Sequence, residues 1–185
     1  MRTFVAIELD KTIKDTLSAL IQKLETGGSN IRWVKPQGMH LTLKFLGEVS
    51  AEKITEVKAV LGSIAKDYSR FPLSLKGTGI FPPAARVPRV VWIGLEKNES
   101  LQNIQARVEN ELHNIQFPRE KREYHSHLTL GRVKGPQNLE TVMGTLNQYK
   151  ETEFGGMNVN KITLFKSTLK PTGAEYTILS EFCLK

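Results

Sequence analysis

The stretch that decides the fold is His-Leu-Thr-Leu at residues 40–43, because the same four residues return at 127–130. Side chains alternate between the two faces of a β-strand, so the histidine and threonine of each copy share one face and the two leucines share the other. Each copy is therefore predicted to be a strand with an apolar face to bury under helices and a polar face that carries an imidazole and a hydroxyl group.

The elements around the two copies follow the same order: a strand, a helix, the His-Leu-Thr-Leu strand and a second helix. Ile7 and Ile93, in the strands that open the two halves, lie 86 positions apart, and His40 and His127 lie 87 positions apart. This shared offset indicates an internal duplication. The expected strands are 3–9, 31–34, 39–46, 73–75, 90–95, 124–133, 159–165 and 176–184, and the expected helical stripes are 13–24, 54–64, 101–112 and 139–149.

Two helix starts and one long loop complete the predicted organisation. Thr12 with Asp15 resembles a capping box for the first helix, and Ser50 is placed to cap the second. The stretch 77–88 is rich in glycine and proline, so we expect an ordered loop there.

The repeat predicts an α+β fold rather than a solenoid, because its period is far too long for one. We expect two pseudo-symmetric lobes, each an antiparallel sheet with outer helices, and an active-site cleft between them. Residues 1–185 are expected to form a single bilobed domain, since this length fits one compact unit.

The protein is basic, and this charge favours a polyanionic partner. The formal net charge is +7 and the sequence pI is about 9.5, which favours nucleic acid. The single cysteine, Cys183, excludes an internal disulfide and a thiolate metal cage. No apolar run approaches the length of a membrane span, and residues 4–9 are too short for a signal sequence. We therefore expect a cytoplasmic monomer that does not contact membranes.

The two histidines suit acid–base chemistry on a phosphodiester. Imidazole titrates near neutrality, so one of the pair His40 and His127 can accept a proton from water while the other donates one to the leaving oxygen. The hydroxyl groups of Thr42 and Thr129 can donate to the non-bridging phosphate oxygens, where charge develops in the transition state. This scheme needs neither a metal nor another cofactor.

A metal site is the alternative at the same place. His125 lies two residues before His127, so alternation puts both on one face, and His40 could join them. However, no carboxylate or cysteine completes the set at a familiar spacing, so we expect no metal. The remaining histidine, His113, is expected at the end of a helix.

Three further residues are candidates for substrate binding. Arg132 and Phe45 each lie five positions after a repeat histidine. Strict alternation turns both away from the histidine face, but a bulge or turn near Gly47 or Gly131 would re-aim them. Arg132 could then clamp a phosphate and Phe45 could stack on a base. Alternation puts Lys44 on the face of His40.

At these residues the sequence resembles the two-histidine phosphoesterases, and more closely the RNA 2′,3′-cyclic phosphodiesterases once called 2′-5′ RNA ligases. The matching segments span nearly the whole chain in order: Arg2–Ile7, His40–Gly47, His127–Val133 and Leu164–Leu169. One departure is Ser126, where many members have proline. The resemblance implies a bilobed α+β fold with its cleft between the lobes.

The resemblance also implies an activity and roles. Members hydrolyse a terminal RNA 2′,3′-cyclic phosphate to a 2′-phosphate without metal, and they can join RNA ends through a 2′-5′ linkage. By position, His40 would be the proton donor to the 3′ oxygen and His127 the base that activates water. The residues alone leave these two roles interchangeable, because the lobes are nearly symmetric.

The expected partner is RNA with a cyclic phosphate terminus, with tRNA fragments as candidates. Two alternatives stay open. One is a phosphodiesterase that acts on small nucleotides or on 2′-5′ oligonucleotides. The other is a non-catalytic RNA-binding module, although such a module would be expected to have lost one of the histidines or threonines, and all four are present.

Overall fold

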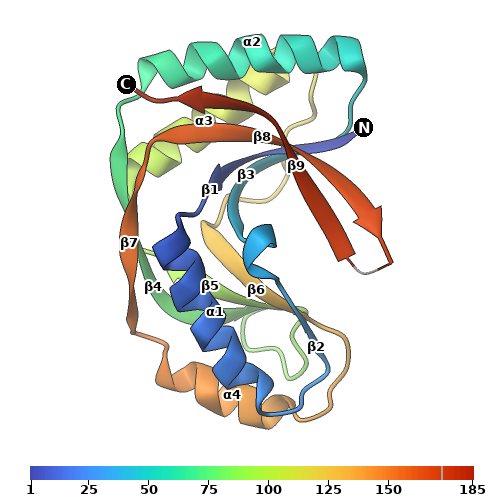
Figure 1. Cartoon of the computed structure of the whole chain (residues 1–185), viewed down its shortest axis with the longest axis vertical. Helices are drawn as coiled ribbons and strands as arrows, with labels where there is room; N and C mark the ends of the chain where they lie inside the picture. The colour runs from blue at the N-terminus through green and yellow to red at the C-terminus, as the bar shows by residue number, and fades with distance from the viewer. Residues whose placement is uncertain (172) are drawn as a thin grey trace.

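The computed structural model describes residues 1–171 and 173–185, which form two antiparallel β-sheets with α-helices on their outer sides (Figure 1). The first sheet has the strand order β3-β1-β8-β9, from β1 (Arg2–Glu8), β3 (His40–Glu48), β8 (Lys161–Lys170) and β9 (Gly173–Cys183). The second has the order β2-β6-β5-β4-β7, from β2 (Ile31–Trp33), β4 (Phe71–Phe81), β5 (Val90–Leu95), β6 (His127–Val133) and β7 (Glu153–Val159). The predicted α+β class is confirmed.

The helices cover one face of each sheet. They are α1 (Lys11–Glu25), α2 (Ala51–Asp67), α3 (Glu99–Asn114) and α4 (Leu139–Gln148), with a short 3-10 turn, η1 (Pro36–Gly38). Helices α2 and α3 contact each other and the first sheet, whereas α1 and α4 contact each other and the second sheet. Each helix buries the apolar stripe that its sequence spacing predicts.

The two halves of the sequence interleave. Helix α1 follows β1 of the first sheet but packs against β7 of the second, and α3 follows β5 of the second sheet but packs against β3 of the first. One continuous cluster of buried apolar side chains therefore runs through both lobes, from Val5 to Leu184. The two sheets therefore share one hydrophobic core.

The structure corrects two local predictions and confirms one. Asp10, not Thr12, caps α1, because the Asp10 carboxylate accepts a 2.8 Å hydrogen bond from the Ile13 amide. Ser50 caps α2 as predicted, accepting from the Lys53 amide. The expected loop at 77–88 begins later, because β4 continues through Gly77 to Phe81. Gly77 has φ +72°, a conformation that glycine adopts without strain, so the strand bends there without ending.

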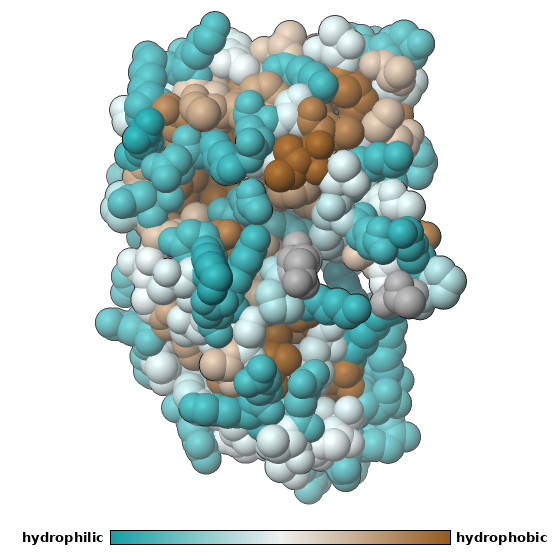
Figure 2. All heavy atoms as spheres, viewed as in Figure 1, coloured by the Kyte–Doolittle hydropathy of each residue, from teal (hydrophilic) through white to brown (hydrophobic). Residues whose placement is uncertain are grey.

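The surface differs between the two sheets. Hydrophilic residues cover most of the face seen in Figure 2, and the main hydrophobic patch on that face lies in its upper half, over the first sheet. Three exposed large hydrophobic residues belong to this sheet: Phe45, Leu169 and Ile178. Within residues 1–171 and 173–185, no helix is both long and apolar enough to cross a membrane.

Candidate active site

His40 opens β3 directly after η1 and lies against aromatic rings. Its ring centroid is 4.6 Å from that of Phe4, 4.9 Å from Tyr176 and 5.9 Å from Phe165. Phe4 and Phe165 face each other across β1 and β8 and are almost fully buried. Burial lowers the pKa of His40 to about 4, although a hydrogen bond with the Gly38 backbone acts in the opposite direction. The imidazole is therefore neutral in the free protein at pH 7.

His127 opens β6 in a second aromatic setting. Its ring lies 5.0 Å from Phe81 and 6.4 Å from Trp92. Burial lowers its pKa, a hydrogen bond to the His125 backbone raises it, and the charges of His125 and Arg132 lower it further. Nδ1 lies 2.7 Å from the His125 carbonyl oxygen. Because a carbonyl only accepts, Nδ1 carries the hydrogen and Nε2 is left as the acceptor of the neutral ring.

The two histidines repeat one local arrangement. Each ring makes a hydrogen bond with the backbone of the residue two positions earlier, Gly38 for His40 and His125 for His127. Strands β3 and β6 contact each other and meet in the middle of the molecule (Figure 1). Tyr124 strengthens this contact, because its hydroxyl donates to the Thr42 carbonyl oxygen at 3.2 Å.

A β-bulge follows each histidine at the same place. The β1–β3 register skips Leu43, and the β5–β6 register skips Leu130. One extra residue in a strand reverses the alternation beyond it. As a result Phe45 lies on the face of His40, with its ring 5.9 Å from Phe4, and Arg132 lies on the face of His127, whose pKa it lowers. Phe45 is 64% exposed, so its ring is available to a ligand.

The prediction that Lys44 shares the face of His40 is wrong. The bulge at Leu43 comes before Lys44 and turns its side chain toward α3, where it is 4% exposed. Its ammonium group donates to Glu109 Oε1 at 2.7 Å and to the Pro118 carbonyl oxygen at 2.9 Å. Lys44 therefore links β3 to α3 and to the segment before β6, and its buried ammonium group is not available to bind a substrate.

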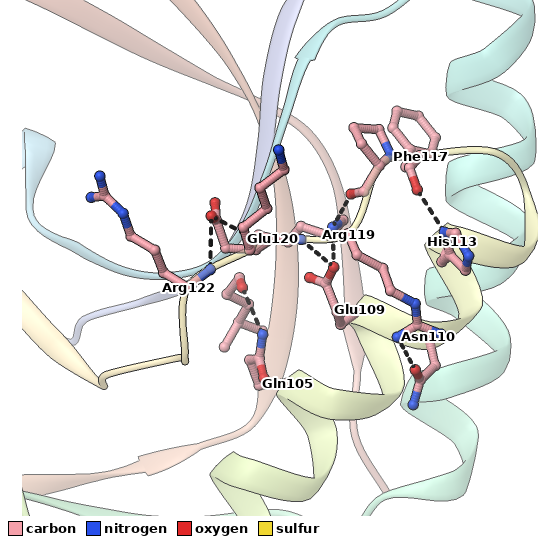
Figure 3. A network of polar contacts seen from close by, with 12 residues as sticks. Gln105, Glu109, Asn110, His113, Phe117, Arg119, Glu120 and Arg122 are labelled. Atoms are coloured by element: carbon pink, nitrogen blue, oxygen red, sulfur yellow. Dashed lines mark hydrogen bonds and ion pairs between the residues drawn. The ribbon is translucent and has the colours of Figure 1, made fainter.

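The surroundings of Lys44 form a polar network between α3 and the segment before β6 (Figure 3). Gln105 Nε2 donates to the Leu43 carbonyl oxygen at 3.4 Å, and Glu109 Oε1 also accepts from the Glu120 amide at 2.9 Å. Figure 3 shows Gln105 and Glu109 on one side of α3, with Arg119 and Glu120 beside them. This network supports the bulged part of β3 from behind, on the face opposite the histidine.

The threonines lie where alternation predicts. Thr42 and Thr129 are half-buried, and each lies two residues from its histidine, before the bulge, so histidine and threonine share a face. His113 lies in the last turn of α3, as expected, and its Nδ1 makes a hydrogen bond with the Phe117 carbonyl oxygen.

The metal alternative finds no support in these positions. Among the residues that the structure describes, no group of three or more His, Cys, Asp or Glu side chains is arranged to hold a metal ion. His40, His125 and His127 thus do not converge as a ligand set.

Sequence reasoning missed the aromatic residues around the two histidines. Phe4, Phe165 and Tyr176 come from three different strands, and Phe81 and Trp92 come from β4 and β5. Their strands are far apart in sequence, so only the strand order shows which rings meet. Alternation in β1 offers a partial signal, because it puts Phe4, Ala6 and Glu8 on one face.

Comparisons with known proteins agree with this geometry. The model of the LigT-like phosphoesterase family matches residues 7–92 and again residues 93–176. A protein named RNA 2′,3′-cyclic phosphodiesterase from Methanothermobacter thermautotrophicus is 34% identical over 184 residues, covering 100% of this chain and 99% of the relative. One of the same name from Methanocaldococcus jannaschii is 36% identical, covering 98% of this chain and 100% of the relative.

Solved structures give the same picture. A crystal structure from Thermus thermophilus superposes with a TM-score of 0.86 at 27% identity, covering 100% of this chain and 98% of the other. E. coli LigT complexed with 3′-AMP superposes with a TM-score of 0.79 at 27% identity, covering 99% and 97%. With a family match over most of its length and relatives that align from end to end, this chain belongs to the LigT-like phosphoesterase family.

Proposed function

We propose that this protein hydrolyses the 2′,3′-cyclic phosphate at an RNA end to a 2′-phosphomonoester, by acid–base catalysis with His40 and His127 and without a metal. The observation that carries the proposal is the paired arrangement of the histidines. Each opens a strand on a helix-free face, each is fixed by a bond to the backbone two residues earlier, and each has a threonine beside it. The names of the full-length relatives support the substrate.

The reaction needs one proton accepted and one donated. Nε2 of His127 takes a proton from water as the water oxygen bonds to phosphorus. The bond between phosphorus and the 3′ oxygen breaks, and His40 gives its proton to that oxygen. The products are a 2′-phosphate and a 3′-hydroxyl, and proton exchange with solvent restores both rings. Thr42, Thr129 and Arg132 hold the non-bridging oxygens, where negative charge gathers in the transition state.

The donor must acquire its proton in the complex. Burial holds the pKa of His40 at about 4 in the free protein, so the ring is neutral near pH 7. An anionic phosphate placed beside the ring favours the protonated form and raises that pKa. Protonation of His40 is therefore coupled to substrate binding, and the charge of Arg132 favours the neutral, accepting form of His127.

We propose that the same site also supports ligation. If a 5′-hydroxyl of RNA replaces water, His127 takes its proton, the 5′ oxygen bonds to phosphorus and the 3′ oxygen leaves with the proton of His40. The product is a 2′-5′ phosphodiester. Both histidine strands come from one chain, so we propose that the monomer is the working unit, and tRNA fragments are among the RNA substrates to test.

The test is incubation of the purified protein and excess EDTA with a short RNA that ends in a 2′,3′-cyclic phosphate. We expect ring opening to a 2′-phosphate, identified by phosphorus NMR. A 3′-phosphate would overturn the assignment of the leaving oxygen. Turnover that requires an added metal would overturn the mechanism, and no turnover in either condition would overturn the proposed function.

A further inference from the structure

Arg32 is a charged residue of the helix-free face that the proposed reaction does not use. It is the middle residue of β2, it is exposed, and its register partner on β6 is Arg132. Residues directly opposite each other in an antiparallel pair point to the same side of the sheet. Since Arg132 lies on the face of His127, Arg32 lies on that face as well.

The two arginines are register partners on β2 and β6, and among the described residues neither forms an ion pair with a carboxylate. Like charges directly opposite on neighbouring strands destabilise the pair. In the described part of the chain, Arg107 is the arginine that forms ion pairs. An anion bound between or along Arg32 and Arg132 would relieve this repulsion, so the arrangement favours a ligand with negative charge.

The side chain of Arg32 also reaches beyond its own sheet. Its guanidinium lies so close to Gly173 that a Cβ atom at that glycine would be 2.9 Å from Nη2. Gly173 begins β9 in the first sheet, while Arg32 belongs to the second. The Arg32 guanidinium therefore lies where the two sheets approach each other. Arg132 is on the same strand as His127, and Arg32 is on the neighbouring edge strand.

We propose that Arg32 forms a second phosphate site, which binds the phosphodiester on the 5′ side of the terminal cyclic phosphate, while Arg132 holds the reacting group. This inference rests on the proposed function and names its substrate class. A cyclic mononucleotide carries one phosphate, which binds Arg132, so Arg32 has no phosphate to bind. An oligonucleotide carries a second phosphate next to the first and engages both arginines. The site thus selects RNA ends over free cyclic nucleotides, in keeping with the net charge of +7.

The experiment compares kcat/KM for a cyclic mononucleotide, 2′,3′-cyclic AMP, with kcat/KM for a trinucleotide that ends in the same cyclic group. Arg32→Gln is expected to lower the preference for the trinucleotide by roughly tenfold, the effect of losing one charge-assisted hydrogen-bonding partner. Arg32→Lys is expected to retain part of the preference, because lysine keeps the charge but not the paired donors. Arg70→Gln is the matched control, since it removes the same charge from an exposed residue beside the C-terminus, and should change neither rate.

Binding of a 5′-labelled trinucleotide with a 3′-phosphate, followed by fluorescence anisotropy, separates this inference from the proposed reaction. Arg32→Gln should reduce the slope of log Kd against log salt by about 0.7, the loss of one contact to single-stranded RNA. If Arg32→Gln lowers both rates equally, or leaves the slope as in the wild type, the second phosphate site is wrong. If the wild type binds with the expected slope but hydrolyses neither substrate, the proposed function fails and the site stands.

Discussion

Strands β3 and β6 are two versions of one design with different surroundings. Both begin with His-Leu-Thr-Leu, both bulge at the second leucine, and both hold the histidine ring through the backbone two residues earlier. Both rings have aromatic neighbours, but the exposed Phe45 lies on the face of His40, whereas Arg132 lies on the face of His127. The repeated backbone positions the two proton-transfer groups. The side chains that differ, Phe45 and Arg132, make the surface beside His40 apolar and the surface beside His127 positively charged.

The residue that directly follows each bulge also differs between the two strands: it is Lys44 in β3 and Gly131 in β6. β6 lies inside its sheet between β2 and β5, and a Cβ at Gly131 would be 2.7 Å from the Ile31 side chain. β3 is an edge strand, so its equivalent residue, Lys44, has room to reach α3. Strand position in the sheet, rather than the repeat, therefore decides which residue fits.

The largest expected effect comes from the histidines themselves. His40→Ala and His127→Ala should each lower kcat by about 10²–10⁴-fold, because each removes a proton-transfer partner. Circular dichroism checks that both variants fold. If the roles differ as proposed, the His127 variant loses the acid limb of the pH–rate profile and the His40 variant loses the alkaline limb. The reverse pattern would exchange the two roles, and near-wild-type turnover in either variant would refute the mechanism.

Lys44 offers the next largest effect, on stability. Lys44→Met leaves the carboxylate of Glu109 unpaired in a site where the two side chains are 4% and 15% exposed. Breaking a buried pair in this way costs about 3 kcal/mol, which urea denaturation measures. Lys44→Met with Glu109→Gln should recover most of the loss, because no charge is then stranded. The KM of the single variant, measured below its unfolding transition, should stay unchanged. A raised KM would show that Lys44 contributes to substrate binding.

Acid should lower the free energy of unfolding, and His40 should contribute more to this loss than His127. The pKa of His40 falls from 6.5 to about 4 on folding, so between these values the unfolded chain binds more protons than the folded one. The contribution of neutral His40 to the free energy of unfolding is fully present above about pH 6.5. It declines as pH falls toward 4, and about 2 kcal/mol is lost at pH 5. His40→Asn should flatten this dependence more than His127→Asn. Equal flattening, read from urea midpoints at pH 7.5 and 5, would show that the two rings are equally desolvated.

Local patterns are enough to predict the helices and the histidine strands. The apolar stripes of α1 to α4 and the alternation within residues 40–43 and 127–130 depend on neighbours in sequence, and the structure contains each of them. Pairing between strands is a long-range property. The expected strand 159–165 is therefore the last residue of β7 and the first half of β8, with Asn160 between the two strands.

The side-chain error has the same origin. Alternation holds only while the register is regular, and a bulge is defined by the partner strand, which the sequence does not identify. This is why alternation assigns Lys44 to the wrong face, while it predicts correctly the positions of His40 and Thr42, which precede the bulge. The opposition of Arg32 and Arg132 likewise becomes visible only once β2 is known to pair with β6.

The smallest effect expected is at Phe45, the counterpart of Arg132. Its ring is 64% exposed and packs beside Phe4, so Phe45→Ala should change stability by less than about 0.5 kcal/mol. If the ring stacks on a base, as expected from the sequence, the loss is roughly 1–3 kcal/mol of binding, seen as a raised KM with little change in kcat. Phe45→Trp is the matched control and should keep a low KM. An unchanged KM in Phe45→Ala would mean that the apolar lobe serves only to desolvate His40, and that substrate contacts are concentrated on the arginine side.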